Sequence, residues 1–185
     1  IWATSCPDHL QQRRSACQAA LQISNAEGEF NAANPAVQLQ THIAVHSGRM
    51  ALGNVGAVDH FEYRAVGDIV NTVSRLEGLN KHLGTGILAT AAVMDGLDSF
   101  LYREVGVFVL RGKANPVSVV ELLCEAGNAS PDQEQLCSLF HKALQAYRAR
   151  NWEQALSHFD ELLASRPQDG PSLFYRKLCL KLRAR

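Results

Sequence analysis

The sequence predicts a sheet domain of the α/β or α+β type, followed by a small unit built only of helices. Three observations lead to this prediction. Helical and strand-like patterns alternate from residue 1 to residue 124, as they do in domains that mix helices with a sheet. Residues 125–135, EAGNASPDQEQ, are small and polar and contain no large apolar run, which indicates a linker. Residues 136–185, the helical tail, then show helical periodicity alone.

The first part of the sheet domain is expected to hold one helix and one half-buried strand. Residues 8–24 carry apolar side chains at helical spacing, and the stretch after them is broken by Gly28 and Pro35. Residues 38–45, QLQTHIAV, alternate between apolar and polar in the manner of a strand with one buried face. Residues 46–68 indicate two more extended pieces around glycine turns.

The next helix separates an apolar stripe from a polar pair. The apolar positions recur at intervals that bury one face of a helix: Ile69, Val73, Leu76 and Leu83. Asp68 is expected as the N-cap, where its carboxylate would meet free amide groups and the positive end of the helix dipole. Asn71 and Arg75 are four residues apart, so they differ by only about 40° around the helix axis and share a face. That face lies roughly 140° from the centre of the apolar stripe.

The rest of the sheet domain is predicted to contain three strands and a short helix. Residues 85–90 form the first of these strands, and residues 91–97 form the short helix. Residues 100–110 and 115–124 supply the other two strands, which flank the turn RGKANP at residues 111–116.

The helical tail resembles a tetratricopeptide repeat. Ala143 takes the small position of the first helix, and Ala155 and Phe159 have the A-x3-F spacing of the second. Pro167 would end this helix pair, and residues 172–182 would form a capping helix. Because one repeat is too few for a free-standing solenoid, we expect the tail to lean on the sheet domain or on further repeats.

Composition and charge exclude several classes of partner. Lys plus Arg and Asp plus Glu both number 18, so no global field favours nucleic acid or an anionic membrane surface. The chain contains no run of about 18 apolar residues and no charged-then-apolar leader, so we expect no membrane contact within it. Its five cysteines are scattered without metal-ligand spacing, which fits a reducing cytoplasm. Because the chain starts with Ile, we expect it to be a fragment of a longer protein.

Asn71 and Arg75 are the candidate catalytic residues. An arginine offers a planar fork matched to phosphate oxygens, and an asparagine one turn earlier offers an amide that can orient a sugar or hydroxyl. Together they could hold a nucleotide where charge develops on phosphorus. On spacing alone, the alternative is a solvated pair on an exposed helix face.

Three separated blocks support the nucleotide hypothesis: HSGRMALGNVG (residues 46–56), YRAVGDIVNTVSRLEG (63–78) and LRGKANPV (110–117). With them, residues 1–123 resemble the class III adenylate and guanylate cyclase catalytic domain, particularly its bacterial adenylate cyclase branch. The resemblance implies an α+β, ferredoxin-like sheet domain, truncated here at its N-terminus, that works as a homodimer with ATP bound between subunits. It also implies conversion of ATP to 3′,5′-cyclic AMP and pyrophosphate, assisted by two Mg²⁺ or Mn²⁺ ions.

The resemblance also implies roles for four residues. Asn71 matches the family asparagine that orients the ribose, and Arg75 matches the arginine that stabilises the pentacoordinate transition state. Lys113 matches a lysine near the terminal phosphates, and its alternative is a solvated turn lysine. Arg64 stands where many relatives carry an Asp or Thr that contacts the adenine, which leaves the choice between ATP and GTP open. The alternative for Arg64 is an arginine that is salt-bridged at the dimer surface.

We assign no metal ligand within the chain, because the family's two metal-binding aspartates and its adenine-selecting lysine align upstream of residue 1. Asp8, Asp59 and Asp68 are not put in their place, since they are expected to start a helix, to sit in a hairpin turn and to cap a helix. His42 and His46 share a strand face but lack a third ligand nearby. We therefore expect the chain alone to make no cyclic nucleotide and the longer protein to make it.

Relatives of this branch often carry a sensor and membrane helices ahead of the catalytic domain, so the longer protein is expected to place this portion in the cytoplasm with a possible anchor in the inner membrane. Missing leading strands should leave one sheet edge unpaired. The alternative function is a catalytically inactive module for dimerisation or nucleotide sensing, whose helical tail binds a protein partner. Guanylate cyclase activity is a lesser alternative.

Overall fold

A four-stranded mixed sheet forms the centre of the protein in the computed structural model, which describes residues 8–57, 60–113 and 115–184. Its strands, in the order in which they lie side by side, are β1 (Ile43–Val45), β4 (Ile87–Thr90), β6 (Val117–Glu125) and β5 (Phe100–Phe108). β1 runs parallel to β4, and the other two pairs are antiparallel. The order and directions confirm the α+β class.

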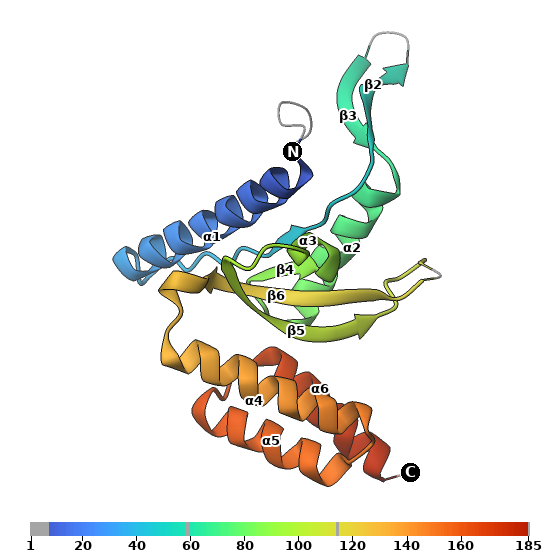
Figure 1. The fold of residues 1–185 in the computed structure, drawn as a ribbon. Coiled ribbons are helices and arrows are strands. Elements are labelled where there is room, and N and C mark those ends of the chain that lie inside the picture. Colours follow the sequence, from blue (N-terminus) through green and yellow to red (C-terminus); the bar gives the residue numbers. More distant parts are fainter. Residues whose placement is uncertain (1–7, 58–59, 114, 185) are drawn as a thin grey trace.

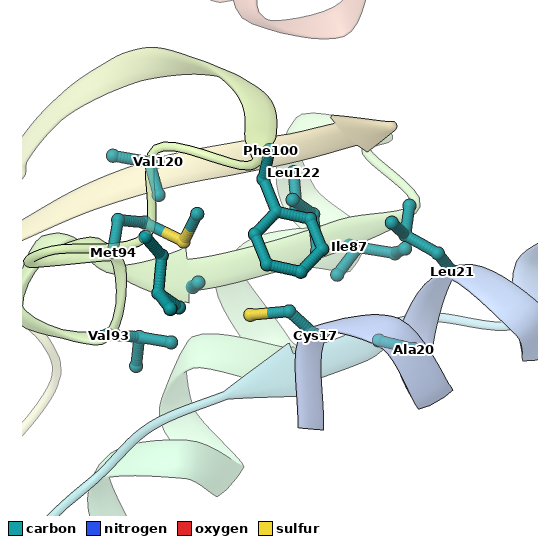
Figure 2. Packing of buried hydrophobic residues seen from close by; sticks show 11 residues of the cluster. Cys17, Ala20, Leu21, Ile87, Val93, Met94, Phe100, Val120 and Leu122 are labelled. Atoms are coloured by element: carbon teal, nitrogen blue, oxygen red, sulfur yellow. The ribbon is translucent and has the colours of Figure 1, made fainter. Parts of the chain in front are cut away.

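One face of this sheet is covered by α1 (His9–Ala33) and the short α3 (Ala91–Met94). Cys17 and Leu21 of α1 lie in one cluster with Phe100 and Leu122 of the sheet (Figure 2). Cys17 is completely buried, and burial raises the pKa of its thiol to about 11. The thiol is therefore neutral and serves as a packing group.

α1 is longer than predicted, because it continues past residue 24 and through Gly28. A single glycine inside a helix costs only about 1 kcal/mol, which the flanking turns outweigh. The helix ends at Ala33, and the next residue, Asn34, precedes Pro35 and has left the helical conformation, as the restriction on residues before proline requires. It begins after Asp8 as predicted, and the Asp8 carboxylate accepts hydrogen bonds from two backbone N–H groups of the first turn.

Only the last part of the strand predicted for residues 38–45 is a strand, namely β1. The backbone N–H groups of Leu39 and Thr41 donate to side chains of α1, to Asn31 at 2.8 Å and to Glu27 at 3.0 Å. These side-chain acceptors replace the neighbouring strand that the alternating pattern had indicated.

α2 (Asp68–Leu83) packs on the opposite face of the sheet. Leu76 and Leu83 are buried there against side chains of β4, β5 and β6. Ile69 and Val73 were predicted to share this buried stripe but are only half-buried, and they line a groove of about 360 Å³ between α1, α2 and β1. In the described part of the chain no strand pairs with the outer edge of β1, so the sheet stops short of these two side chains.

Two strands form a hairpin apart from the main sheet, at the place where the glycine-rich pattern predicted two extended pieces. They are β2 (Ala51–Ala57) and β3 (His60–Val66), which pair antiparallel from Ala51 opposite Val66 to Ala57 opposite His60. Figure 1 shows that this hairpin projects away from the body of the protein.

Three helices form a unit that lies below the main sheet in Figure 1, on the side away from α1. We call α4 (Pro131–Arg148), α5 (Trp152–Ser165) and α6 (Gly170–Arg183) the helical unit. The predicted linker is wrong in its second half, because α4 already begins at residue 131. Ser130 and Gln133 form a capping box, so the polar residues that indicated a linker are the first turn of a helix. A short 3₁₀ turn, η1 (Ala126–Asn128), fills the rest of the connection.

The helical unit has its own core and leans on the sheet, as predicted. Ala143, Ala155 and Phe159 are completely buried in that core, where small side chains let α4 and α5 pack closely. Leu123 of β6 packs against the same core. Across residues 8–57, 60–113 and 115–184, none of the helices has the length and apolar character needed to cross a bilayer.

Candidate active site

The site is built around the N-terminal half of α2. The predicted N-cap is wrong by one residue, because Gly67 is the N-cap and Asp68 is the first residue of the helix. Gly67 has φ of 153°, and an added side chain there would meet the backbone of Met50 at 3.5 Å. The Asp68 carboxylate is consequently free of the helix end and forms an ion pair with Lys113.

Asn71 and Arg75 lie on α2 one turn apart, away from the buried leucines of that helix. The Asn71 side chain is exposed, and Arg75 is half-buried. The Arg75 guanidinium packs against Gly112 in the turn between β5 and β6, where an added Cβ would lie 3.1 Å from Arg75 Nη2. Gly112 has φ of 69°, so both its conformation and its neighbour favour glycine.

Lys113 follows Gly112 in the same turn, which its backbone N–H closes by donating to the carbonyl of Leu110 at 2.9 Å. Only 17% of the Lys113 side chain is exposed, and its ammonium group pairs with Asp68. The structure thus brings Arg75 and Lys113 to the same turn, and the lysine is not a freely solvated turn residue.

His46, which follows β1, lies beside this ion pair. Its Nδ1 is 2.9 Å from the hydroxyl of Thr90. Burial lowers the pKa of His46, the charge of Lys113 lowers it further, and Asp68 acts in the opposite direction. The hydrogen bond from Lys113 lowers the pKa of Asp68, against partial desolvation, and the charges of Lys113, Arg75 and His46 add to the lowering. His46 was not predicted at this place, although it opens the first of the three sequence blocks.

Asn80 fixes the other end of α2 and was also missed. It is completely buried, and its Nδ2 donates to the carbonyl oxygens of Ile43 and Gly86, each at 2.9 Å. Its Oδ1 accepts a hydrogen bond from the hydroxyl of Thr85. These bonds tie α2 to the beginnings of β1 and β4. The sequence signal was a polar residue four positions after Leu76, on the buried face of the helix.

Arg64 lies elsewhere, on β3 of the projecting hairpin. Its side chain is 62% exposed and forms an ion pair with Glu62. The described residues show no hydrogen bond or ion pair between Arg64 and Asn71 or Arg75. Within one chain, therefore, the structure does not bring Arg64 to the other three predicted residues.

The described residues do not by themselves fit a divalent metal. No group of three His, Cys, Asp or Glu side chains gathers anywhere in residues 8–57, 60–113 and 115–184. Asp68, the carboxylate nearest to Arg75 and Lys113 in this cluster, is already engaged by the lysine. What the site offers is two cationic side chains and a neighbouring amide, a combination suited to a ligand that carries phosphate.

The adenylate and guanylate cyclase catalytic domain is the family whose model matches this chain, over residues 2–122. The chain belongs to this family.

Two relatives carry adenylate cyclase names. Adenylate cyclase 1 of Rhizobium meliloti (strain 1021) is 36% identical over 127 residues, which cover 66% of this chain and 19% of the relative. The terminal-differentiation specific adenylate cyclase of Dictyostelium discoideum is 28% identical over 148 residues, which cover 77% of this chain and 7% of the relative. The chain thus spans only a minor part of the length of these relatives.

Two solved structures share the fold. The adenylyl cyclase CyaB from P. aeruginosa superposes with a TM-score of 0.54 at 17% identity, over 69% of this chain and 67% of that chain. The guanylyl cyclase Cya2 gives a TM-score of 0.50 at 19% identity, over 69% of this chain and 64% of that chain. At these identities the likeness shows that the chain has the mixed α+β cyclase fold.

Proposed function

We propose that this chain is the C-terminal portion of the catalytic domain of an adenylate cyclase, which converts ATP to 3′,5′-cyclic AMP and pyrophosphate. The observation that carries the proposal is the meeting of Arg75 with the Lys113 turn, one helical turn from Asn71, in a member of the cyclase family. The adenylate cyclase named in Rhizobium meliloti, 36% identical to this chain, supports ATP as the substrate.

In the proposed reaction the 3′-hydroxyl of ATP attacks the α-phosphorus. A bond forms between O3′ and phosphorus, the bond to the bridging oxygen breaks, and pyrophosphate leaves with that electron pair, while the 3′-hydroxyl proton is released to water. The Asn71 amide would orient the ribose, and the Arg75 guanidinium would stabilise the negative charge that develops on the phosphoryl oxygens. Lys113 would bind the terminal phosphates as a point charge.

The proposed reaction uses Mg²⁺ or Mn²⁺, which would be bound by the carboxylates expected upstream of residue 1. A bound divalent ion would neutralise the triphosphate and polarise the phosphoryl oxygen. Since the described residues lack such a site, we assign to them only the groups that bind and orient ATP. We expect the chain alone to make no cyclic AMP.

We propose further that the enzyme works as a homodimer in which the β2–β3 hairpin meets the second subunit. A two-stranded hairpin is only marginally stable alone, and this one leaves Tyr63 72% exposed and Val66 52% exposed. Contact with a second subunit would cover both side chains. It would also carry Arg64 toward the nucleotide of the partner, which accounts for its distance from Asn71 and Arg75 within one chain.

The helical unit is proposed to be a single tetratricopeptide-like repeat with a capping helix, open to a protein partner. The complete burial of its small and aromatic positions supports the repeat assignment, and α6 leaves Leu173 and Leu180 partly exposed. A cytoplasmic location agrees with the absence of disulfides among Cys17 and the other described cysteines, Cys124, Cys137 and Cys179.

The second candidate function is an inactive cyclase-like module for dimerisation or nucleotide sensing. Arg64 favours it, because this arginine pairs with its own neighbour Glu62 at a position that selects the base in the family.

The deciding experiment uses the chain extended upstream to include the remaining catalytic segment. The purified dimer is incubated with ATP or GTP and Mg²⁺ or Mn²⁺, and the products are identified by mass spectrometry. We expect cyclic AMP from ATP, and its loss in Asn71→Ala. A folded dimer that makes no cyclic nucleotide would support the inactive module, and cyclic GMP as the main product would identify a guanylate cyclase.

A further inference from the structure

We propose that the helical unit is a positioning element for the candidate active site, because it fixes the end of α2 and the middle of β5. The inference rests on the proposed function for its catalytic consequence and on the observed packing for its structural part. It concerns residues 169–175, which the catalytic hypothesis does not use.

A buried ionic clamp attaches the helical unit to β5. Arg103 of β5 donates two hydrogen bonds to Asp169, Nη1 to Oδ2 at 3.0 Å and Nη2 to Oδ1 at 2.6 Å. It also donates from Nε to Glu121 of β6 at 2.6 Å, and its guanidinium lies 4.8 Å from the ring centre of Phe140 in α4. The Arg103 side chain is only 3% exposed. Such a bidentate, desolvated contact fixes orientation as well as distance.

Asp169 joins this clamp to the start of α6. Its Oδ2 also accepts a hydrogen bond from the backbone N–H of Ser172 at 3.1 Å, so the same carboxylate is the N-cap of the helix. The position of α6 is therefore determined by β5.

The first residue of α6 touches the last residue of α2. A Cβ added to Gly170 would lie 1.6 Å from the carbonyl oxygen of Leu83 and 2.7 Å from its carbonyl carbon. Only glycine permits this approach. Four residues later, Phe174 contacts His82 of α2 edge to face, with ring centres 5.9 Å apart, and it contacts Phe108 of β5 at 6.0 Å.

The next residue of α6 reaches β5 as well. The hydroxyl of Tyr175 lies 2.1 Å from the place where a Cβ of Gly106 would stand, at a backbone φ of 141°. β5 leads within a few residues to Gly112 and Lys113. The helical unit thus contacts both α2, which carries Arg75, and β5, which leads into the turn of Lys113.

α2 transmits the contact because it is a continuous helix. Leu83 is eight residues from Arg75, or about 12 Å along the helix axis. Asn80 ties the same end to the sheet, so a shift of α6 moves a helix that is held at its C-terminal end and carries Arg75 at its middle. A small misplacement of a group that acts in the transition state lowers turnover strongly.

The test compares two glycine-to-alanine variants. Gly170→Ala forces α6 away from Leu83, whereas Gly78→Ala, in α2 itself, adds a methyl that meets nothing within 4 Å. Phe174→Leu is the second test variant, since it removes the ring contacts without adding atoms. Amide hydrogen exchange is measured on the 185-residue chain.

We expect Gly170→Ala and Phe174→Leu to raise exchange at residues 79–85 of α2 and at the turn of residues 110–113, while β4 and β6 keep wild-type protection. Gly78→Ala should not raise exchange at any of these amides, because alanine favours the helix and the added methyl meets nothing within 4 Å. If Gly170→Ala does not fold, Phe174→Leu decides alone. Unchanged exchange in α2 and the turn, or a uniform rise across the sheet, overturns the proposal.

In the upstream-extended enzyme, Gly170→Ala or Phe174→Leu should lower kcat about 10-fold or more with little change in KM for ATP, and Gly78→Ala should not. If the wild-type enzyme makes no cyclic nucleotide, the proposed function fails, and the exchange result still decides whether the helical unit positions α2. Normal kcat in variants whose α2 exchange is raised would overturn the catalytic part of the inference.

Discussion

Lys113 and Asp68 form an ion pair that joins the turn after β5 to the first residue of α2. The two residues are 45 positions apart in the chain. The negative charge of Asp68 offsets the repulsion between Lys113 and Arg75, whose charges both lower the pKa of Asp68. The local order of the site therefore depends on Asp68, an acidic residue that is not itself a predicted phosphate ligand.

The ion pair should be visible in the titration of Asp68. The hydrogen bond from Lys113 holds the Asp68 pKa below its usual value, and Lys113→Gln should bring the pKa back up. Because the folded pKa is lowered, the pair stabilises the fold at neutral pH, and this contribution disappears as the pH falls through the folded pKa. Carboxyl NMR of the labelled chain measures the Asp68 pKa in the wild type and in Lys113→Gln. Lys81→Gln, which removes a lysine paired with Glu77 on α2, is the control and should leave Asp68 unchanged.

Two asparagines of α2 should differ in their contribution to the stability of the fold. Asn80→Ala removes a donor from the carbonyl oxygens of Ile43 and Gly86 and leaves the buried Thr85 hydroxyl without its acceptor, so we expect a loss of about 1–3 kcal/mol in the free energy of unfolding. Asn71→Ala, the same change at an exposed position, should cost less than about 0.5 kcal/mol. Urea denaturation of the chain measures both, and equal losses would contradict the structural role of Asn80.

Two glycines with left-handed backbones should separate the effect of backbone strain from the effect of contact with Arg75. Gly112→Ala and Gly84→Ala place a side chain at φ of 69° and 64°, and each should cost about 1–2 kcal/mol of stability. Only Gly112→Ala also presses a methyl against Arg75, because the added Cβ at Gly84 meets nothing within 4 Å. In the upstream-extended enzyme, turnover should fall further in Gly112→Ala than in Gly84→Ala. Equal turnover in the two variants would mean that the turn does not support Arg75.

Two aspartates of the helical unit should differ sharply in their effect on stability. Asp169→Ala strips Arg103 of its bidentate partner in a buried site, and breaking such a pair costs about 3–5 kcal/mol. Asp160→Ala removes an exposed partner of Arg176, a loss of about 0–1 kcal/mol. Thermal and urea unfolding compare them. Similar small losses in both variants would show that the clamp does not hold the helical unit to the sheet.

The helix that carries Asn71 and Arg75 could be predicted because its evidence is local. Leu76 and Leu83 repeat at helical intervals, and the position of the polar pair on another face follows from 100° per residue. The pairing of β5 with β6 around a glycine turn was predictable for the same reason. The helices of the tail followed from periodicity as well, although the capping turn at Ser130 was taken for linker because helix N-termini and linkers have similar composition.

The contacts that join distant segments could not be predicted. Asp68 was expected to cap its own helix, whereas it pairs with a residue 45 positions away. Asn80 looked like one more polar helix residue until β1 and β4 placed two carbonyl oxygens beside it. Arg103 and Asp169 carry no local signal at all. Each of these side chains takes its role from packing between elements, which sequence periodicity does not describe.

The most direct test of the central claim is the turnover of Arg75 variants in the upstream-extended enzyme with ATP. We expect Arg75→Ala to lower kcat about 100-fold or more with a much smaller change in KM, because the guanidinium acts mainly on charge that develops in the transition state. Arg75→Lys should recover only part of the rate, since an ammonium cannot reproduce the planar fork. Arg150→Ala, in the helical unit, is the control and should match the wild type. An Arg75→Ala enzyme that turns over ATP at the wild-type rate would contradict the account.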